Sequence, residues 1–178
     1  KGKLLDLSEP KVMGVLNLTP DSFYDGRRYF SNIDNALRQT EQMLSAGATI
    51  IDIGGMSSQP GAKLISVAEE LQRVLPTIEA IHKKFPQAIL SIDTVRSEVA
   101  RQAVAAGASI VNDISAGNFD EKLLETVADL QVPYILMHMQ GKPETMQNKP
   151  VYENIVLEMV AFFQEKLEKI NALGIRDV

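Results

Sequence analysis

The sequence predicts an α/β fold built on a parallel sheet, and it favours a (β/α)8 TIM barrel of which about five and a half β/α units are present. Three observations predict this fold. Short apolar segments alternate with helical segments, a glycine turn recurs along the chain, and polar residues follow the apolar segments. Strands that alternate with helices are typical of a parallel sheet, because each helix returns the chain to the same end of the sheet.

Each predicted strand is a short, nearly continuous apolar run. Such runs are expected of strands that are buried on both faces, and several are rich in Ile and Val. The runs are Val12–Leu16, Thr49–Ile53, Ala88–Ile92, Ser109–Ile114 and Val132–Met137.

Helical patterns fill the intervals between the runs. Ser66 and Glu69 form a capping box, and Ser97 is suited to cap another helix. Pro76 is expected to kink or split the helix that contains it. The predicted helices are Asn35–Ala46, a helix that opens at Ser66, a helix from Ser97 to near Gly107, Asp120–Leu130, and Asn154–Leu173, which Gly174 closes.

An internal repeat supports the alternation. Residues 46–52 (AGATIID) recur as residues 106–112 (AGASIVN), and a weaker copy begins at Leu173. Each copy joins a helix end, a glycine turn and a strand start, two strand–helix units apart. We therefore expect one barrel domain over residues 1–178, cut off before its sixth strand.

Polar residues follow the carboxyl ends of the predicted strands. They are Asn17, Gly54-Gly55, Asp93, Asn112-Asp113 and His138. This is the end at which (β/α)8 barrels assemble their active sites. An open doubly wound sheet also binds ligands there, so this alternative stays open. The absence of a Gly-x-Gly-x-x-Gly fingerprint after the first strand weakens its dinucleotide-binding version.

The loop after the first strand, residues 17–23 (NLTPDSF), is the richest in chemistry. Its Asn, Thr, Asp and Ser side chains offer several oxygen ligands and hydrogen-bond partners. The same residues also make a well-capped turn, and the loop alone does not decide between the two interpretations.

Five blocks together resemble dihydropteroate synthase, in order and spacing, over essentially the whole chain. The blocks are residues 17–23, residues 54–62 (GGMSSQPGA), residues 91–94 (SIDT), residues 112–114 (NDI) and residues 137–141 (MHMQG). The first two are highly specific in combination. The resemblance implies an enzyme of folate biosynthesis and a sulfonamide target. It would condense 7,8-dihydropterin pyrophosphate with p-aminobenzoate, giving 7,8-dihydropteroate and pyrophosphate.

The resemblance also implies roles for individual residues. Asn17 would be a catalytic residue and the Mg²⁺ ligand, and Asp93, also catalytic, would hold the pterin together with Asn112. Ile114 and Met137 would form apolar walls of the pocket. Other interpretations stay open. Asn17 could hydrogen-bond the loop backbone, and Asp93 could cap a helix or be a buried structural carboxylate. The two apolar residues could belong to the ordinary barrel core.

The loop after the second strand departs from the family pattern. The family places Ser or Thr and then Arg on the pyrophosphate, whereas this chain has Ser58 and Gln59. Loss of one charge-assisted hydrogen bond to phosphate would weaken binding by about 1.5–3 kcal/mol. The loops around Phe23 and Pro60 would form the p-aminobenzoate pocket.

Four further titratable residues need separate interpretations. We expect Asp52 to be an interior hydrogen-bond brace, whereas Asp113 is either a brace or a ligand contact. His138 is expected to be a structural hydrogen-bond partner outside catalysis, and His82 to be solvated beside Lys83.

Composition excludes several classes of function. The net charge is −5 and the basic residues are scattered, so no nucleic-acid or membrane partner is expected. No apolar run approaches the roughly 20 residues needed to cross a bilayer. The chain has no cysteine, which fits a cytoplasmic enzyme. The resemblance suggests a homodimer formed through later helices.

Two rival functions remain open. A pterin-dependent methyltransferase also binds a pterin with Asp and Asn, but residues 17–23 better suit a substrate that carries pyrophosphate and magnesium. A non-catalytic pterin-binding module would fit Gln59, and it would fit the absence of the family's later pterin and phosphate motifs from these 178 residues.

Overall fold

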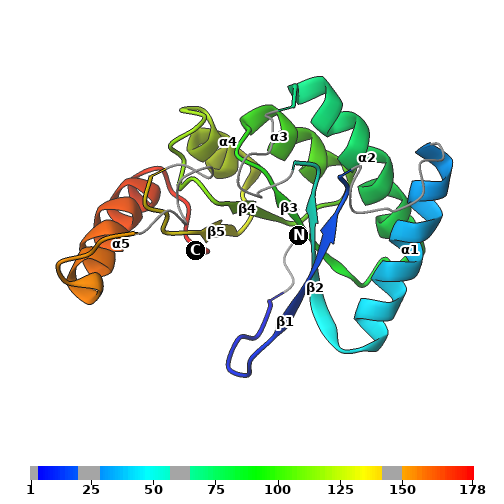
Figure 1. Cartoon of the computed structure of the whole chain (residues 1–178), viewed down its shortest axis with the longest axis horizontal. Coiled ribbons are helices and arrows are strands. Elements are labelled where there is room, and N and C mark those ends of the chain that lie inside the picture. The colour runs from blue at the N-terminus through cyan, green and yellow to red at the C-terminus, as the bar shows by residue number, and fades with distance from the viewer. Residues whose placement is uncertain (1–3, 20–28, 57–64, 142–149) are drawn as a thin grey trace.

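The strands lie in the sheet in the same order as in the chain. The computed structural model describes residues 4–19, 29–56, 65–141 and 150–178. Its one sheet has the order β1-β2-β3-β4-β5, and all neighbouring strands are parallel (Figure 1). A doubly wound sheet reverses its order at a switch point, so sequential order excludes that alternative and confirms the barrel type. The strands are β1 (Val12–Asn17), β2 (Ala48–Gly54), β3 (Ile89–Asp93), β4 (Ile110–Asp113) and β5 (Tyr134–Leu136).

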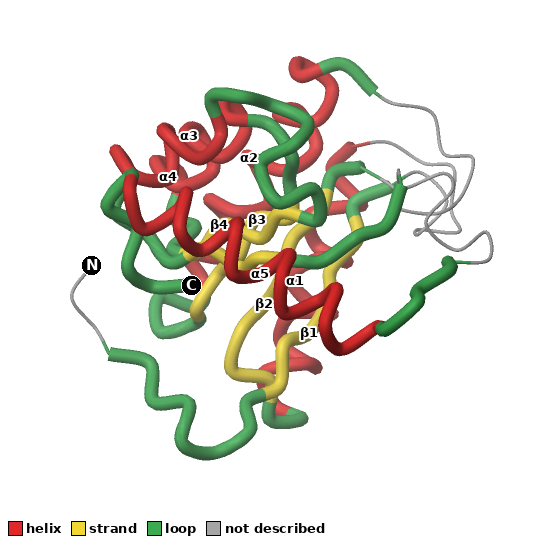
Figure 2. The backbone as a smooth tube through the Cα atoms, turned by 90° about the vertical axis from the view of Figure 1, so that its left-hand side faces the viewer, coloured by secondary structure: helices red, strands yellow, loops and turns green. Residues whose placement is uncertain are grey.

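A helix follows each strand. In chain order they are α1 (Tyr29–Ser45), α2 (Val67–Lys84), α3 (Ser97–Ala106), α4 (Leu123–Leu130) and α5 (Ile155–Ala172). The first four pack in sequence, α1 on α2, α2 on α3 and α3 on α4. In Figure 2 the strands lie side by side, with α2, α3 and α4 along one side of the sheet. None of the helices in the described ranges is both long and apolar enough to cross a membrane.

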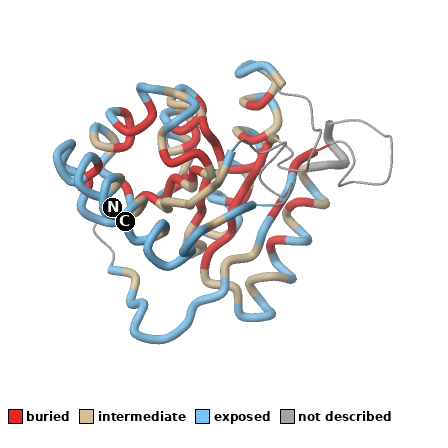
Figure 3. Tube along the Cα trace, turned by 60° about the vertical axis from the view of Figure 1, so that its left-hand side comes forward, coloured by how far each residue is buried: buried red, intermediate tan, exposed pale blue. Residues whose placement is uncertain are grey.

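The hydrophobic core fills the space between the sheet and these helices. One row of paired strand residues points into it, and all of its members are essentially buried: Leu16, Ile53, Ile92, Val111 and Tyr134. Buried positions, red in Figure 3, run along the strands. Because side chains alternate between the two faces of a strand, the residues on either side of this row point to the barrel interior.

Several predicted element bounds were wrong. Helix α1 begins at Tyr29 rather than Asn35, and α4 begins at Leu123 rather than Asp120. Helix α2 has a Ser66 cap that accepts a hydrogen bond from the Glu69 N–H at 3.1 Å, as predicted. It also runs unbroken through Pro76, so the expected split does not occur.

The N-terminus of α3 corrects the predicted Ser97 cap. Arg96 occupies the N-cap position and makes no side-chain cap hydrogen bond. The backbone N–H of Ser97 instead donates to Oδ2 of Asp120 at 2.7 Å, and Oδ1 of Asp120 accepts from the backbone N–H of Lys122 at 3.0 Å. Asp120 therefore precedes α4 and serves two chain segments, which explains why it lies outside the helix.

The repeated glycine turns are real structural repeats. Gly47, Gly107 and Gly174 all have positive φ, at 102°, 127° and 87°. After the third turn Ile175 is buried, and the backbone N–H of Tyr134 donates to the carbonyl of Asp177 at 2.8 Å. Residues beyond Gly174 thus lie beside β5, where the sixth strand of a barrel belongs.

Candidate functional site

The predicted polar residues lie in one row across the carboxyl end of the sheet. Strand pairing aligns Asn17 with Gly54, Gly54 with Asp93, Asp93 with Asn112, and Asn112 with Ile135. Paired residues in a parallel sheet point to the same face, and this row lies on the face opposite the buried core row. The structure therefore brings together residues from four β/α units that the sequence spreads over almost a hundred positions.

Gly54 makes space for the polar groups on both sides of it. A β-carbon placed there would lie 3.4 Å from Oδ1 of Asn17 and 3.4 Å from Oδ2 of Asp93. Those are ordinary contact distances, so both side chains converge above the glycine. A larger residue at position 54 would occupy the space between the amide and the carboxyl group.

Asp93 is the carboxyl group whose environment is the most unusual. It is half-buried, and burial raises its pKa to about 7, with the nearby negative charges of Asp52, Glu70 and Asp113 adding to the shift. A carboxyl group with such a pKa exchanges between a hydrogen-bond donor and an acceptor at neutral pH. It can therefore pair with a heterocyclic ring edge that presents both donors and acceptors.

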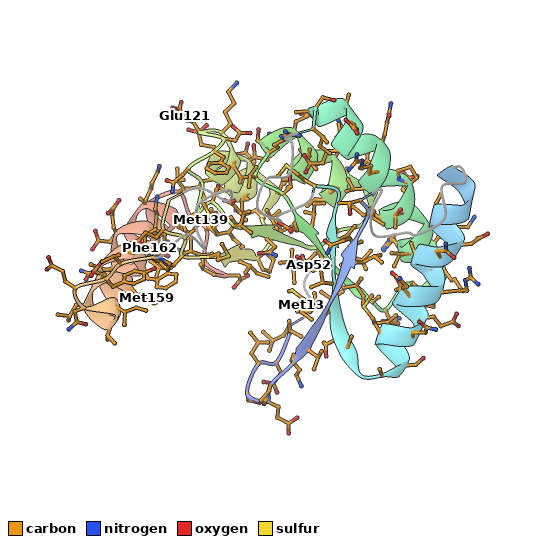
Figure 4. All side chains as sticks on the ribbon, viewed as in Figure 1. Met13, Asp52, Glu121, Met139, Met159 and Phe162 are labelled. Carbon is orange, nitrogen blue, oxygen red and sulfur yellow. The ribbon has the colours of Figure 1, made fainter. Side chains whose placement is uncertain are left out.

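Asn112 is held from below by Asp52. Its Nδ2 donates to Oδ2 of Asp52 at 2.9 Å, so Asp52 is the interior brace that we expected. Asp52 lies on the interior face of the sheet, one layer below the row of polar residues, and Met13 lies on the same face a further layer down (Figure 4). The other carboxylate oxygen of Asp52, like Oγ of its buried neighbour Ser91, has no hydrogen-bond partner within the described part of the chain.

Asp113 is a structural residue. It is fully buried, and its carboxylate accepts three hydrogen bonds, from the backbone N–H of Ser115 at 2.7 Å, the backbone N–H of Gly117 at 2.6 Å and the hydroxyl of Tyr134 at 2.6 Å. Burial, with the charge of Asp113, raises the pKa of Tyr134 well above its usual range. Asp113 thus organises the turn after β4, and its lone pairs are engaged within the fold.

Ile114 and Met137 directly follow β4 and β5, and both are half-buried. The core cluster described above does not include them. Their place at the carboxyl ends of two strands is compatible with walls of a pocket, but no contact assigns them to one. Their predicted role stays a prediction.

Neither histidine belongs to the paired row of polar residues. The ring of His138 packs edge-on against Phe162 of α5, with 4.7 Å between ring centroids, and it also neighbours Tyr152 and Phe163. The described contacts of His138 are thus with aromatic rings, and its expected role as a structural hydrogen-bond partner stays a prediction. His82 is exposed, as predicted, although its ring lies against Gly107.

Four predicted substrate-binding residues fall outside the described residues. Phe23 lies within residues 20–28, and Ser58, Gln59 and Pro60 lie within residues 57–64.

Sequence reasoning missed a buried ionic cluster next to Asp93. Glu70 of α2 is fully buried and pairs with Arg96 at 2.7 Å, and it also accepts from the hydroxyl of Thr94 at 2.7 Å. The helical spacing of Glu70, Val74 and Ile81 places all three on the buried face of α2, and this periodicity could have revealed the glutamate.

A magnesium ion would find few protein ligands here. Within the described ranges, no group of three or more His, Cys, Asp or Glu side chains is placed to hold a metal. Asn17 offers one exposed amide oxygen at the end of β1. Mg²⁺ often keeps several waters and takes one or two protein ligands together with substrate phosphates, so a single amide oxygen fits that kind of site.

A sheet of this order, with an acid and amides at the carboxyl ends of its strands, is the arrangement that barrel enzymes typically use for small polar ligands. The family described as pterin binding enzyme matches residues 13–178, and the chain belongs to that family.

Named relatives share most of this chain. It is 47% identical over 174 residues to the dihydropteroate synthase of Haemophilus influenzae, covering 98% of this chain and 62% of that protein. It is 47% identical over 175 residues to the Escherichia coli K12 enzyme of the same name, covering 98% and 61%.

Solved structures agree. A Yersinia pestis dihydropteroate synthase with a sulfonamide drug has a TM-score of 0.89 at 46% identity, covering 99% of this chain and 63% of that one. A Xanthomonas albilineans dihydropteroate synthase with 4-aminobenzoic acid has a TM-score of 0.86 at 41% identity, covering 97% and 60%. This chain therefore spans about three fifths of the length of these relatives.

Proposed function

We propose that the protein is a dihydropteroate synthase that joins p-aminobenzoate to 7,8-dihydropterin pyrophosphate. One observation carries the proposal: Asp93 and Asn112 are paired neighbours at the carboxyl end of the sheet, in a chain of the pterin-binding enzyme family. The names of the relatives at 47% identity support the same activity.

The pair Asp93 and Asn112 suits the amino-pyrimidinone edge of a pterin. That edge alternates donors and acceptors, and an amide beside a carboxyl group offers both. The side-chain amide of Asn112 donates one N–H to Asp52, which leaves its side-chain oxygen and its second side-chain N–H for a ligand. Asp93 can adapt its protonation to the ring because its pKa lies near 7.

The reaction needs no protein nucleophile. The bond between the pterin methylene carbon and the pyrophosphate oxygen breaks, and the pyrophosphate takes the electron pair. The amine nitrogen of p-aminobenzoate then forms a bond to that carbon and releases a proton. Mg²⁺ would supply neutralisation of the pyrophosphate charge, with Asn17 as the protein ligand.

Gln59 is proposed to lower the affinity for the pyrophosphate group, because a neutral amide replaces the arginine of the family pattern. Ser58 would still offer a hydroxyl to the phosphates, and Phe23 and Pro60 would border the p-aminobenzoate. Gln59→Arg should lower the Michaelis constant for dihydropterin pyrophosphate about tenfold. An unchanged constant would retire this part of the proposal.

Pyrophosphate release tests the proposed activity. The complete polypeptide is incubated with dihydropterin pyrophosphate and magnesium, with and without p-aminobenzoate. Release that requires p-aminobenzoate, with dihydropteroate as product, is the expected result. Pterin binding without release would indicate a non-catalytic binding module, and methyl transfer that requires a corrinoid partner would indicate the methyltransferase.

The proposal extends to assembly and location. We propose a cytoplasmic homodimer, and sedimentation of the complete polypeptide together with cell fractionation tests both statements. A monomer at micromolar concentration would contradict the first, and recovery with membranes would contradict the second.

A further inference from the structure

The pairing between β3 and β4 ends at the two residues proposed to hold the pterin. Asp93 and Asn112 are the last residues that the register of these two strands pairs. One residue further along, the backbone N–H of Thr94 donates to the backbone carbonyl of Asn112 at 3.0 Å. This hydrogen bond holds the two strand ends together, so the placement of Asp93 beside Asn112 depends on where Thr94 lies.

The position of the Asp93 side chain depends on its backbone. Its carboxyl group makes no hydrogen bond to another residue within the described ranges, where burial and neighbouring charges are what act on it. Both carboxyl oxygens are therefore open to a ligand, and no described side chain fixes their place. The backbone of Asp93 and of Thr94, the next residue, must do so.

The hydroxyl of Thr94 belongs to a closed ring of hydrogen bonds on the helix side of the sheet. It donates to Oε1 of Glu70 on α2 at 2.7 Å and accepts from the backbone N–H of Arg96 at 3.3 Å. Nη1 of Arg96 completes the ring by donating to Oε2 of Glu70 at 2.7 Å. Both carboxylate oxygens of Glu70 thus have a partner, and the buried Thr94 is held on its side chain as well as on its backbone.

Glu70 is itself fixed against the end of β2. A β-carbon added at Gly55, which directly follows β2, would lie 3.2 Å from Cγ of Glu70 and 2.8 Å from Cγ1 of Val74. The backbone after β2 therefore lies directly on this part of α2. Through Thr94, one buried carboxylate consequently fixes the ends of β3 and β4 relative to the end of β2.

Stability alone accounts poorly for a charged ring in this place. The side chain of Glu70 is fully buried and that of Arg96 is 18% exposed, so both lose most of their hydration. Replacing a buried ion pair by apolar residues is often neutral or stabilising. Such a pair is better explained by the geometry that it imposes, and here that geometry is the alignment of the strand ends that carry Asp93 and Asn112.

We propose that Thr94 is a positioning residue for recognition of the pterin ring: its hydroxyl, held by Glu70 and Arg96, keeps Asp93 and Asn112 side by side in the geometry that the ring edge requires. The inference rests on the proposed function, because that function places the pterin on Asp93 and Asn112. It predicts that the hydroxyl of Thr94 affects pterin affinity although it lies on the opposite side of the sheet from the ligand.

The test measures the dissociation constant for a hydroxymethylpterin without phosphates, by titration calorimetry on the complete polypeptide, together with the midpoint of urea unfolding. Thr94→Val replaces the hydroxyl by a methyl group of similar size and should raise the dissociation constant about tenfold. Thr94→Ser keeps the hydroxyl and should stay within about twofold of the parent. Rescue by serine separates the role of the hydroxyl from that of the packed methyl group.

A double variant, Glu70→Met with Arg96→Met, removes the rest of the ring without leaving a lone buried charge. Because apolar replacement of a buried ion pair is often neutral or stabilising, we expect its urea midpoint to stay near that of the parent. The hydroxyl of Thr94 then has no acceptor on α2, so the dissociation constant for the pterin should again rise about tenfold.

Thr126→Val is the matched control. Thr126 is also buried, and its hydroxyl accepts from Nη2 of Arg101 at 3.2 Å, but it lies on α4 and outside the ring. Its substitution should leave pterin affinity unchanged. Pterin affinity within twofold of the parent in Thr94→Val and in the double variant, or equal weakening by Thr94→Val and Thr94→Ser, would overturn the inference and leave the proposed function intact. Failure of the parent protein to bind the pterin would overturn the proposed function and the inference with it.

Discussion

Asn112 of β4 donates its Nδ2 hydrogen to Oδ2 of Asp52 on β2, at 2.9 Å and across the whole width of β3. The bond reaches down one layer on the interior face, because Asp52 is paired with Ser91 whereas Asn112 is paired with Asp93. It fixes which end of the amide faces the ligand side: the oxygen of Asn112 is free to accept. The orientation of a proposed ligand group therefore depends on a residue that need not touch the ligand.

Removing the brace should weaken pterin binding. Asp52→Ala leaves the Asn112 amide without its acceptor and free to rotate, so we expect the dissociation constant for a pterin to rise about tenfold. Asp52→Asn can still accept the hydrogen bond and should lose less. Titration calorimetry with a phosphate-free pterin measures both.

Ser91→Ala is the matched control for the brace, since Ser91 lies beside Asp52 on the same buried layer. Its Oγ has no partner among the described residues, so its loss should leave pterin binding unchanged. Equal weakening by Ser91→Ala and Asp52→Ala would show that the layer acts only through packing.

Asp93 should make stability depend on pH. Its pKa rises from 3.8 to about 7 on folding, because burial and neighbouring carboxylates disfavour the charge. Between about pH 4 and pH 7 the folded state therefore binds more protons than the unfolded state, and the free energy of unfolding falls as pH rises through this window. Above pH 7 the full cost of the buried charge is present.

Asp93→Asn removes that cost. We expect the variant to exceed the parent in unfolding free energy on the order of 2 kcal/mol at pH 8 and to match it near pH 4, measured by urea denaturation. Asp129→Asn, at an exposed position of α4, is the control substitution for the loss of one carboxyl group. A parent that gains stability between pH 5 and pH 7 relative to Asp93→Asn would have the opposite sign and would contradict the assignment.

Tyr134→Phe should destabilise the turn after β4. The tyrosine hydroxyl donates to buried Asp113 at 2.6 Å, and its removal leaves part of a buried charge unsatisfied. We expect a loss of about 1–3 kcal/mol in thermal or urea unfolding. Tyr152→Phe, which keeps its ring contact with His138, should cost less than about 0.5 kcal/mol. Similar losses for the two variants would argue against a special role of the buried hydroxyl.

The two copies of the glycine turn offer a further comparison. The methyl group added by Gly47→Ala would have no atom within 4 Å, so this variant should lose only the free energy of the strained positive φ, about 1–2 kcal/mol. Gly107→Ala carries the same strain, and its methyl group would also lie 2.6 Å from Cγ of His82. It should therefore cost clearly more. Adding His82→Ala to Gly107→Ala should lower the loss without bringing it down to that of Gly47→Ala, because Cβ of residue 82 would still lie 2.9 Å from the new methyl group. An unrelieved double variant would place the strain elsewhere.

Much of the fold follows from local signals. Each of the five predicted apolar runs overlaps a strand of the sheet, since Ile- and Val-rich runs between helices have few other solutions in an α/β protein. The row that joins Asn17, Asp93 and Asn112 could be predicted as well. Parallel strands end at one edge of the sheet, so residues that follow them must meet there.

Other features depend on contacts between distant segments, which no local pattern reveals. Asp120 caps α3 from the region before α4, so the serine at the start of α3 was mistaken for the cap. Helical periodicity places Glu70 on the buried face of α2, but its partner Arg96 is distant in the chain, so no local pattern predicts the pair. Asp113 is a brace rather than a ligand contact because it accepts a hydrogen bond from the hydroxyl of Tyr134 on the next strand, and no local pattern predicts that contact.

The register that aligns Asn17, Gly54, Asp93 and Asn112 also determines which changes in chain length the site can survive. An extra residue in one of the connecting loops would leave every strand in place. An extra residue inside β3, just before Asp93, would turn that carboxyl group toward the helices and put the inserted residue in its place on the interior face. We therefore expect homologous genes to vary in loop length and to keep strand length constant to the residue.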